Sequence, residues 1–102
     1  MNNRNKQTNP EHELYDAILK LETHEECYRF FCDLCTMSEM KALEQRFEVA
    51  RLLSQGKIYN DILEITGASS ATISRVNRSL HYGEDSYWEI FRKLDEQEAK
   101  AE

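Results

Sequence analysis

A segment without negative charge lies in the second half of this acidic chain. No aspartate or glutamate occurs from Ile65 to Gly83, and the stretch "TGASSATISRVNRSL" within it combines hydroxyl side chains with two arginines. Hydroxyl groups donate hydrogen bonds to phosphate or to base edges, and a guanidinium can bind guanine through two parallel hydrogen bonds. A carboxylate on the same surface would repel the DNA backbone. The segment therefore predicts DNA contacts, and the candidate residues are Ser69, Ser70, Ala71, Thr72, Ser74, Arg75 and Arg78.

The apolar residues around this segment have the spacing of a helix-turn-helix at residues 59–82. A short predicted helix precedes Gly67 and a longer one follows it, and a glycine takes the left-handed conformation of such a turn without steric cost. Apolar side chains three and seven residues apart on the second helix share one face, which would pack on the first helix. The expected motif core consists of Ile62, Gly67, Ile73 and Val76, with Ile65 as a further inward-facing residue.

An ordinary helical hairpin with a solvated polar face is the alternative interpretation. Serine-rich stretches cap many helices, so the hydroxyl run is not specific by itself. Leu63 also stands where helix-turn-helix motifs often carry alanine, because the two helices approach closely there. The combination of Gly67, Ala68 and the spaced pair Ile73 and Val76 favours the DNA-reading motif, whose second helix enters the major groove.

Helix start and stop signals divide the chain into six predicted helices. Asn9 before Pro10 is typical of a helix start, and the stretches Thr23–Glu26, Thr36–Glu39 and Ser86–Glu89 have the spacing of capping boxes. No segment has the sustained alternation of a β-strand. We therefore expect an all-α protein with a flexible tail at residues 1–9, a single domain at residues 10–98 and a frayed end at residues 99–102.

The composition excludes several classes of protein. The chain has 102 residues, three cysteines and a formal net charge of −6, so any DNA contact must come from a local surface and not from a basic chain. No apolar run approaches the ~18 residues that a membrane span needs, and the N-terminus lacks the apolar core of a secretory signal. We expect a cytoplasmic protein with free thiols and no membrane association.

A catalytic or metal site is not expected. Cys32 and Cys35 form a CxxC pair with His24 and Cys27 nearby, but their spacing along one helix does not match a common zinc module. The three histidines are scattered, and no serine or cysteine has an evident His/Asp partner. The sequence predicts that the protein is not an enzyme, that it binds no metal or cofactor, and that its thiols are buried in a helix core.

The predicted helices carry more apolar surface than one small chain can bury. Adjacent aromatic residues, such as Phe30 with Phe31 and Tyr87 with Trp88, cannot all face the same core. A two-fold homodimer that shares the excess surface is the simplest solution.

Three stretches, "MSEMKALEQRFEVARLL", "LSQGK" and "ATISRVNRSL", resemble the Trp repressor family, and in particular its uncharacterised Trp-repressor-related branch. The resemblance extends from Leu14 to Trp88. It implies an intertwined homodimer of six-helix chains and a transcriptional regulator, by default a repressor, that reads a palindromic operator in double-stranded DNA. The half-sites would lie about one helical turn apart, with Ser70–Tyr82 in the major groove.

The same resemblance implies a pocket for an effector. In the tryptophan-responsive members the amino acid lies between two arginines, which match Arg46 and Arg75 of this chain. A threonine and a serine that help to hold it match Thr36 and Ser79. Val76 stands where those members have the glycine that leaves room for the indole. We therefore expect that L-tryptophan is not the effector, and that Val76 provides the helix packing that the ligand provides in those members.

Three alternatives stay open at this point. Arg46 and Arg75 could contact phosphate or form surface ion pairs instead of holding a small molecule. The regulator could respond to a small-molecule effector other than tryptophan. The helix-turn-helix could also be purely structural, within a protein-interaction module whose acidic surface binds a basic partner.

Overall fold

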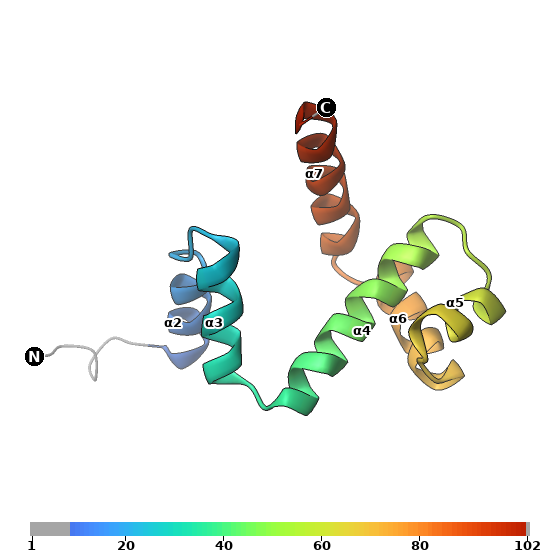
Figure 1. Cartoon of the computed structure of the whole chain (residues 1–102), viewed down its shortest axis with the longest axis horizontal. Coiled ribbons are helices and arrows are strands. Elements are labelled where there is room, and N and C mark those ends of the chain that lie inside the picture. The colour runs from blue at the N-terminus through green and yellow to red at the C-terminus, as the bar shows by residue number, and fades with distance from the viewer. Residues whose placement is uncertain (1–8, 102) are drawn as a thin grey trace, which may run out of the picture. The chain divides into compact units, whose positions relative to one another are not determined.

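The structure is a computed structural model that describes residues 9–101 (Figure 1). This part of the chain contains no strand and six helices: α2 (Pro10–Ile18), α3 (His24–Leu34), α4 (Met37–Ser54), α5 (Tyr59–Thr66), α6 (Ser70–Tyr82) and α7 (Ser86–Ala101). The prediction of an all-α protein with six helices is confirmed. The end expected to fray at residues 99–102 is helical as far as Ala101, where Lys100 in the last turn complements the helix dipole. Residues 1–8 of the expected tail and residue 102 of the expected frayed end lie outside the described residues.

Local capping explains where three of the helices begin. Thr23 Oγ1 accepts a hydrogen bond from the Glu26 N–H at 3.1 Å. Thr36 Oγ1 accepts one from the Glu39 N–H at 3.1 Å, and the Glu39 carboxylate accepts the Thr36 N–H at 2.8 Å, which completes a reciprocal capping box. Asn9 Oδ1 caps α2 by accepting the Glu11 N–H at 3.0 Å. Each of these starts is therefore fixed by side chains within three residues of it.

The start of α7 differs from its predicted capping box. Ser86 is already the first helical residue, so Asp85 takes the preceding position, with a φ of 66°. The Glu89 N–H donates to the backbone carbonyl of Asp85 at 3.2 Å. The predicted box between Ser86 and Glu89 is wrong, because such a box needs the serine outside the helix.

The chain divides into two compact units, and the boundary between Met40 and Lys41 falls inside α4. The first unit holds α2, α3 and the first turn of α4. No side chain of α2 or α3 is fully buried. Cys32 and Cys35 are half-buried and Cys27 is exposed, all three as free thiols. The prediction of buried thiols is therefore wrong for Cys27, because a pair of helices alone encloses little side-chain surface.

The second unit contains the main apolar core. Helix α6 contributes buried side chains at helical spacing, and the turn before it contributes a buried alanine. Helices α4, α5 and α7 complete the cluster. Its members are Val49, Ala50, Ile62, Ala68, Ile73, Val76, Leu80 and Phe91.

Aromatic contacts connect α7 with α4 and α6. The Phe91 ring lies edge-on to Phe47, with centroids 5.4 Å apart, and stacks on Tyr87 at 5.8 Å. The indole N–H of Trp88 donates to the carbonyl oxygen of Leu80 at 2.9 Å. The side of α7 that carries Phe91 is thus fixed against the core of the second unit.

Large apolar side chains remain exposed on both units. Ile65, which we expected to face inward, is 54% exposed. The face of α5 that packs on the core carries Ile62, Leu63 and Thr66. Helical geometry therefore places Ile65 on the outer side of α5. None of the helices within residues 9–101 combines the length and apolarity that a membrane crossing requires. The other large exposed apolar residues are Tyr15, Leu19, Tyr28, Leu34, Met37, Leu43, Phe47, Ile58, Tyr59, Tyr82, Trp88, Ile90 and Leu94.

The packing of α5 on α6 can be tested with two identical substitutions at sites of opposite burial. Ile73→Ala should lower the free energy of unfolding by about 2–5 kcal/mol, because it leaves a cavity in the core. Ile65→Ala should lower it by less than about 1 kcal/mol. Urea denaturation at one fixed protein concentration measures both values. Equal losses for the two variants would contradict the described core.

Candidate nucleic-acid interface

The turn between α5 and α6 consists of residues 67–69. Gly67 has φ 73° and ψ 6°, which is the left-handed region, and its N–H donates to the carbonyl of Leu63 at 2.9 Å. A Cβ at Gly67 would meet no atom within 4 Å, so the glycine is needed for its backbone conformation and not for space. The Thr66 hydroxyl donates to the carbonyl of Ile62 at 2.7 Å and accepts the Ala68 N–H at 3.0 Å. Hydrogen bonds of Gly67 and of Ala68 therefore connect the turn to α5.

Ser69 begins the second helix of the motif as its N-cap. Its Oγ accepts the Thr72 N–H at 3.1 Å and donates to the Thr72 hydroxyl oxygen at 3.1 Å. Two of the hydroxyl groups predicted to approach DNA are thus bonded to each other at the start of α6. Ser70, Ala71 and Ser74 are exposed beside them.

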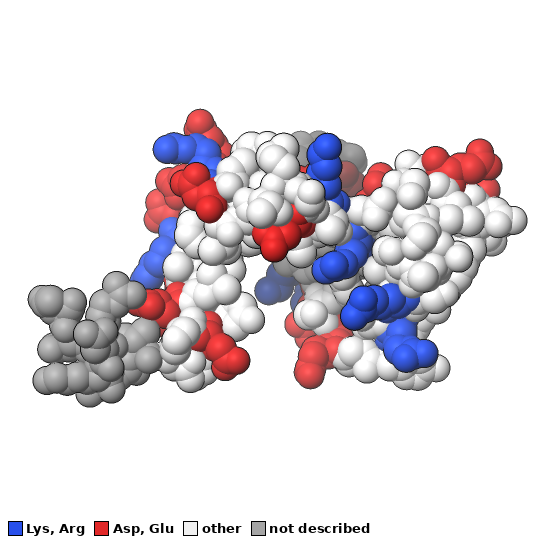
Figure 2. All heavy atoms as spheres, turned by 90° about the horizontal axis from the view of Figure 1, so that it is seen from below, with Lys and Arg blue, Asp and Glu red and all other residues white. Residues whose placement is uncertain are grey.

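One face of α6 is buried and the opposite face is open. Ile73, Val76 and Leu80 enter the core. Arg75 and Arg78 are exposed, and neither forms an ion pair with a carboxylate in the described part of the chain. Figure 2 shows Lys and Arg side chains on both units, with several close together on the second unit. The exposed face of α6 can donate hydrogen bonds and presents two positive charges to an anionic partner.

The residues matched to an effector pocket lie on α4, on α6 and in the loop before α4. Arg46, Arg75 and Ser79 are exposed within the second unit. Thr36 belongs to the first unit, where its hydroxyl accepts the Glu39 N–H. Within the described residues, Arg46 forms no ion pair with a carboxylate.

Val76 is part of the core cluster and is 2% exposed. It packs in the same cluster as Ile62 of α5 and Ile73 of α6. A valine side chain that is fully buried here occupies volume between the motif helices. A ligand ring placed at this point would have to displace it.

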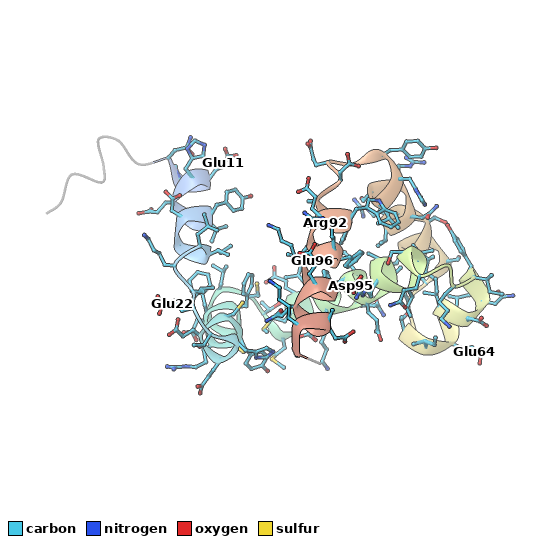
Figure 3. All side chains as sticks on the ribbon, turned by 90° about the horizontal axis from the view of Figure 1, so that it is seen from above. Glu11, Glu22, Glu64, Arg92, Asp95 and Glu96 are labelled. Atoms are coloured by element: carbon cyan, nitrogen blue, oxygen red, sulfur yellow. The ribbon has the colours of Figure 1, made fainter. Side chains whose placement is uncertain are left out.

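An open pocket of about 510 Å³ lies between the end of α4 and α7, and no motif in the sequence indicates it. The Arg51 guanidinium is 4.9 Å from the centroid of the Phe91 ring and is paired with the Asp95 carboxylate. Arg92 is paired with Glu96 at 2.9 Å, and Figure 3 labels this pair and Asp95 along α7. Both arginines that line the pocket are thus engaged with carboxylates. The sequence shows the helical spacing of the residues along α7. It does not show that the end of α4 would lie opposite them.

Within residues 9–101, no three His, Cys, Asp or Glu side chains come together in an arrangement that could hold a metal ion. Glu64 lies on the outer side of α5 in Figure 3. The open face of α6 is therefore the described surface on which the predicted functional residues are most concentrated.

Comparisons with known proteins agree on one family. The family model described as Trp repressor protein matches residues 11–95. The uncharacterized protein YerC of Bacillus subtilis (strain 168) is 51% identical over 89 residues, which cover 87% of this chain and 86% of YerC. A crystal structure from Staphylococcus aureus, provisionally assigned as a Trp repressor, is 47% identical with a TM-score of 0.84, over 93% of this chain and 95% of that one. A TrpR-like protein from Eubacterium eligens ATCC 27750 is 51% identical with a TM-score of 0.83, over 92% and 96% of the two chains.

The geometry of the turn gives a prediction for Gly67. Gly67→Ala should lower the free energy of unfolding by about 1–2 kcal/mol, because a residue with a Cβ is strained in the left-handed region. Gly67→Asn is the matched variant and should lose less, since asparagine tolerates that conformation better. Thermal denaturation of both variants measures the difference. A fully tolerated alanine would show that the turn is not held in the left-handed conformation.

Proposed function

This chain belongs to the Trp repressor family, and on that premise we propose that it is a sequence-specific DNA-binding transcriptional regulator. The observation that carries the proposal is the open face of α6, which lacks acidic residues and bears Arg75 and Arg78, neither of them ion-paired with a described residue. In this proposal α6 enters the major groove. Ser69, Ser70, Ala71, Thr72 and Ser74 approach bases and backbone near the helix start, and the two arginines contact bases or phosphates.

The regulator acts as a homodimer in this proposal. Each chain leaves large apolar side chains exposed on both units, and neither α2 nor α3 has a fully buried side chain. A second copy of the chain would cover such surface within an intertwined dimer. A two-fold dimer would read a palindromic operator in the cytoplasm and would repress transcription by occluding a promoter.

The proposed regulator does not respond to L-tryptophan. Val76 fills volume in the motif core with its own side chain, which is 2% exposed. The helix packing that an indole would supply is already supplied by the protein. Thr36, Arg46, Arg75 and Ser79 would then serve an effector of different shape, or Arg46 and Arg75 would contact phosphate directly.

Removing the two α6 cations tests the DNA-binding proposal. The double variant Arg75→Ala/Arg78→Ala should bind duplex DNA more weakly than wild type. Its log–log salt dependence should be flatter by about 0.9 for each phosphate contact removed. Arg92→Ala is the matched control, because that arginine is paired with Glu96 on α7. Anisotropy titrations with labelled duplex at several salt concentrations give both quantities.

Two results would count against this proposal. Absence of duplex binding by wild type would favour the protein-interaction alternative. An unchanged affinity and salt slope in the double variant would move the DNA contact away from α6.

Calorimetry tests the claim about tryptophan. Titration of L-tryptophan into the wild-type dimer should give no saturable heat, because the Val76 side chain fills the space that the indole needs. The expectation holds with and without duplex DNA present. A micromolar dissociation constant would contradict it and would require Val76 to move aside.

A further inference from the structure

The carbonyl group at the end of α5 receives a hydrogen bond from a distant side chain. Gln45 of α4 donates through Nε2 to the backbone oxygen of Thr66 at 3.1 Å, across 21 residues of sequence. Both residues are half-buried. Among the described residues, this is the one side-chain hydrogen bond that joins α4 to the α5–α6 motif.

This hydrogen bond is important because it lies where α5 ends and the turn to α6 begins. Thr66 is the last residue of α5, where helix carbonyls lack an intrahelical partner and carry partial negative charge. A neutral amide N–H satisfies such an oxygen without adding net charge near DNA. A lysine could do the same, but only with a mobile stem and an additional positive charge.

The constraint extends from Thr66 to the start of α6 within three residues. The Thr66 hydroxyl binds the Ala68 N–H at 3.0 Å, and Ala68 is itself buried in the core. Ser69 follows directly as the cap of α6. Because each of these residues is fixed to the next, a shift of the Thr66 carbonyl would displace the helix end that the proposed function brings to DNA.

We propose that Gln45 is a positioning residue for DNA recognition. It sets the location of the α6 N-terminus from α4 without touching the nucleic acid. The proposal rests on the proposed DNA-binding function, since it assigns Gln45 a part in that function. Displacements of about 1 Å are sufficient to weaken preorganised contacts, so the loss of one anchoring bond should be visible in affinity.

The variant that tests this proposal is Gln45→Met, which keeps the length and helix propensity of the side chain but removes the donor. Gln97→Met, the same change on the exposed surface of α7, is the matched control. The first readout is hydrogen exchange without DNA. Gln45→Met should accelerate exchange of the Ala68 amide by about fivefold, the equivalent of one net hydrogen bond, and leave the Leu94 amide in α7 unchanged.

The second readout is affinity for the duplex that wild type enriches from a random pool. Gln45→Met should bind it about fivefold more weakly, with an unchanged salt slope, because no phosphate contact is removed. Gln97→Met should bind like wild type. A merely structural role would instead accelerate exchange in every helix to the same degree.

These experiments distinguish failure of the proposed function from failure of the proposed role of Gln45. If wild type enriches no duplex, the proposed function is wrong and the inference falls with it. If wild type binds and Gln45→Met binds equally well, only the inference is overturned. Unchanged exchange at Ala68 in Gln45→Met would also overturn it, whatever the DNA result.

Discussion

The packing of α5 on α6 around a left-handed glycine is the constraint on which the second unit depends. Ile62, Ile73 and Val76 occupy one core, and the turn between the helices is only three residues long. A short helix such as α5 is marginal by itself, so its position comes from this packing and not from propensity. Once the inner face of α6 is committed to the core, the direction of its outer face follows from helical geometry.

The charge distribution of the chain matches this division of α6 into a buried inner face and an exposed outer face. The formal net charge is −6, yet the surface from Ile65 to Gly83 carries no carboxylate. At physiological ionic strength, exposed charges more than about 8 Å apart are largely screened, so a phosphate at this face is affected mainly by the nearest charges, and those on α6 itself include Arg75 and Arg78. Acidic residues elsewhere favour solubility and weaken attraction to nucleic acid at other surfaces. A negative protein with one neutral-to-basic helix face is thus physically consistent with a selective DNA reader.

Much of the local structure could be predicted from the sequence, because its causes are local. The caps at Thr23 and Thr36 and the all-α class depend on residues within a turn of one another. Contacts between distant segments were not predictable. The bond from Gln45 to Thr66, the stacking of Arg51 on Phe91 and the outward direction of Ile65 all depend on how α4, α5 and α7 pack. The spacing of apolar residues in the sequence indicates which face of a helix is buried. The neighbouring helices decide which residues at the edge of that face are covered.

Val76 connects the fold to its proposed mode of regulation. A side chain that completes the core in place of a ligand would leave α6 in its reading position at all times. The most direct measurement is the affinity of the wild-type protein for its enriched duplex, titrated with and without saturating L-tryptophan at one salt concentration. A dissociation constant that is the same in both series is the predicted result. Tighter binding only with tryptophan would contradict the account, because the motif would then be incomplete without a ligand.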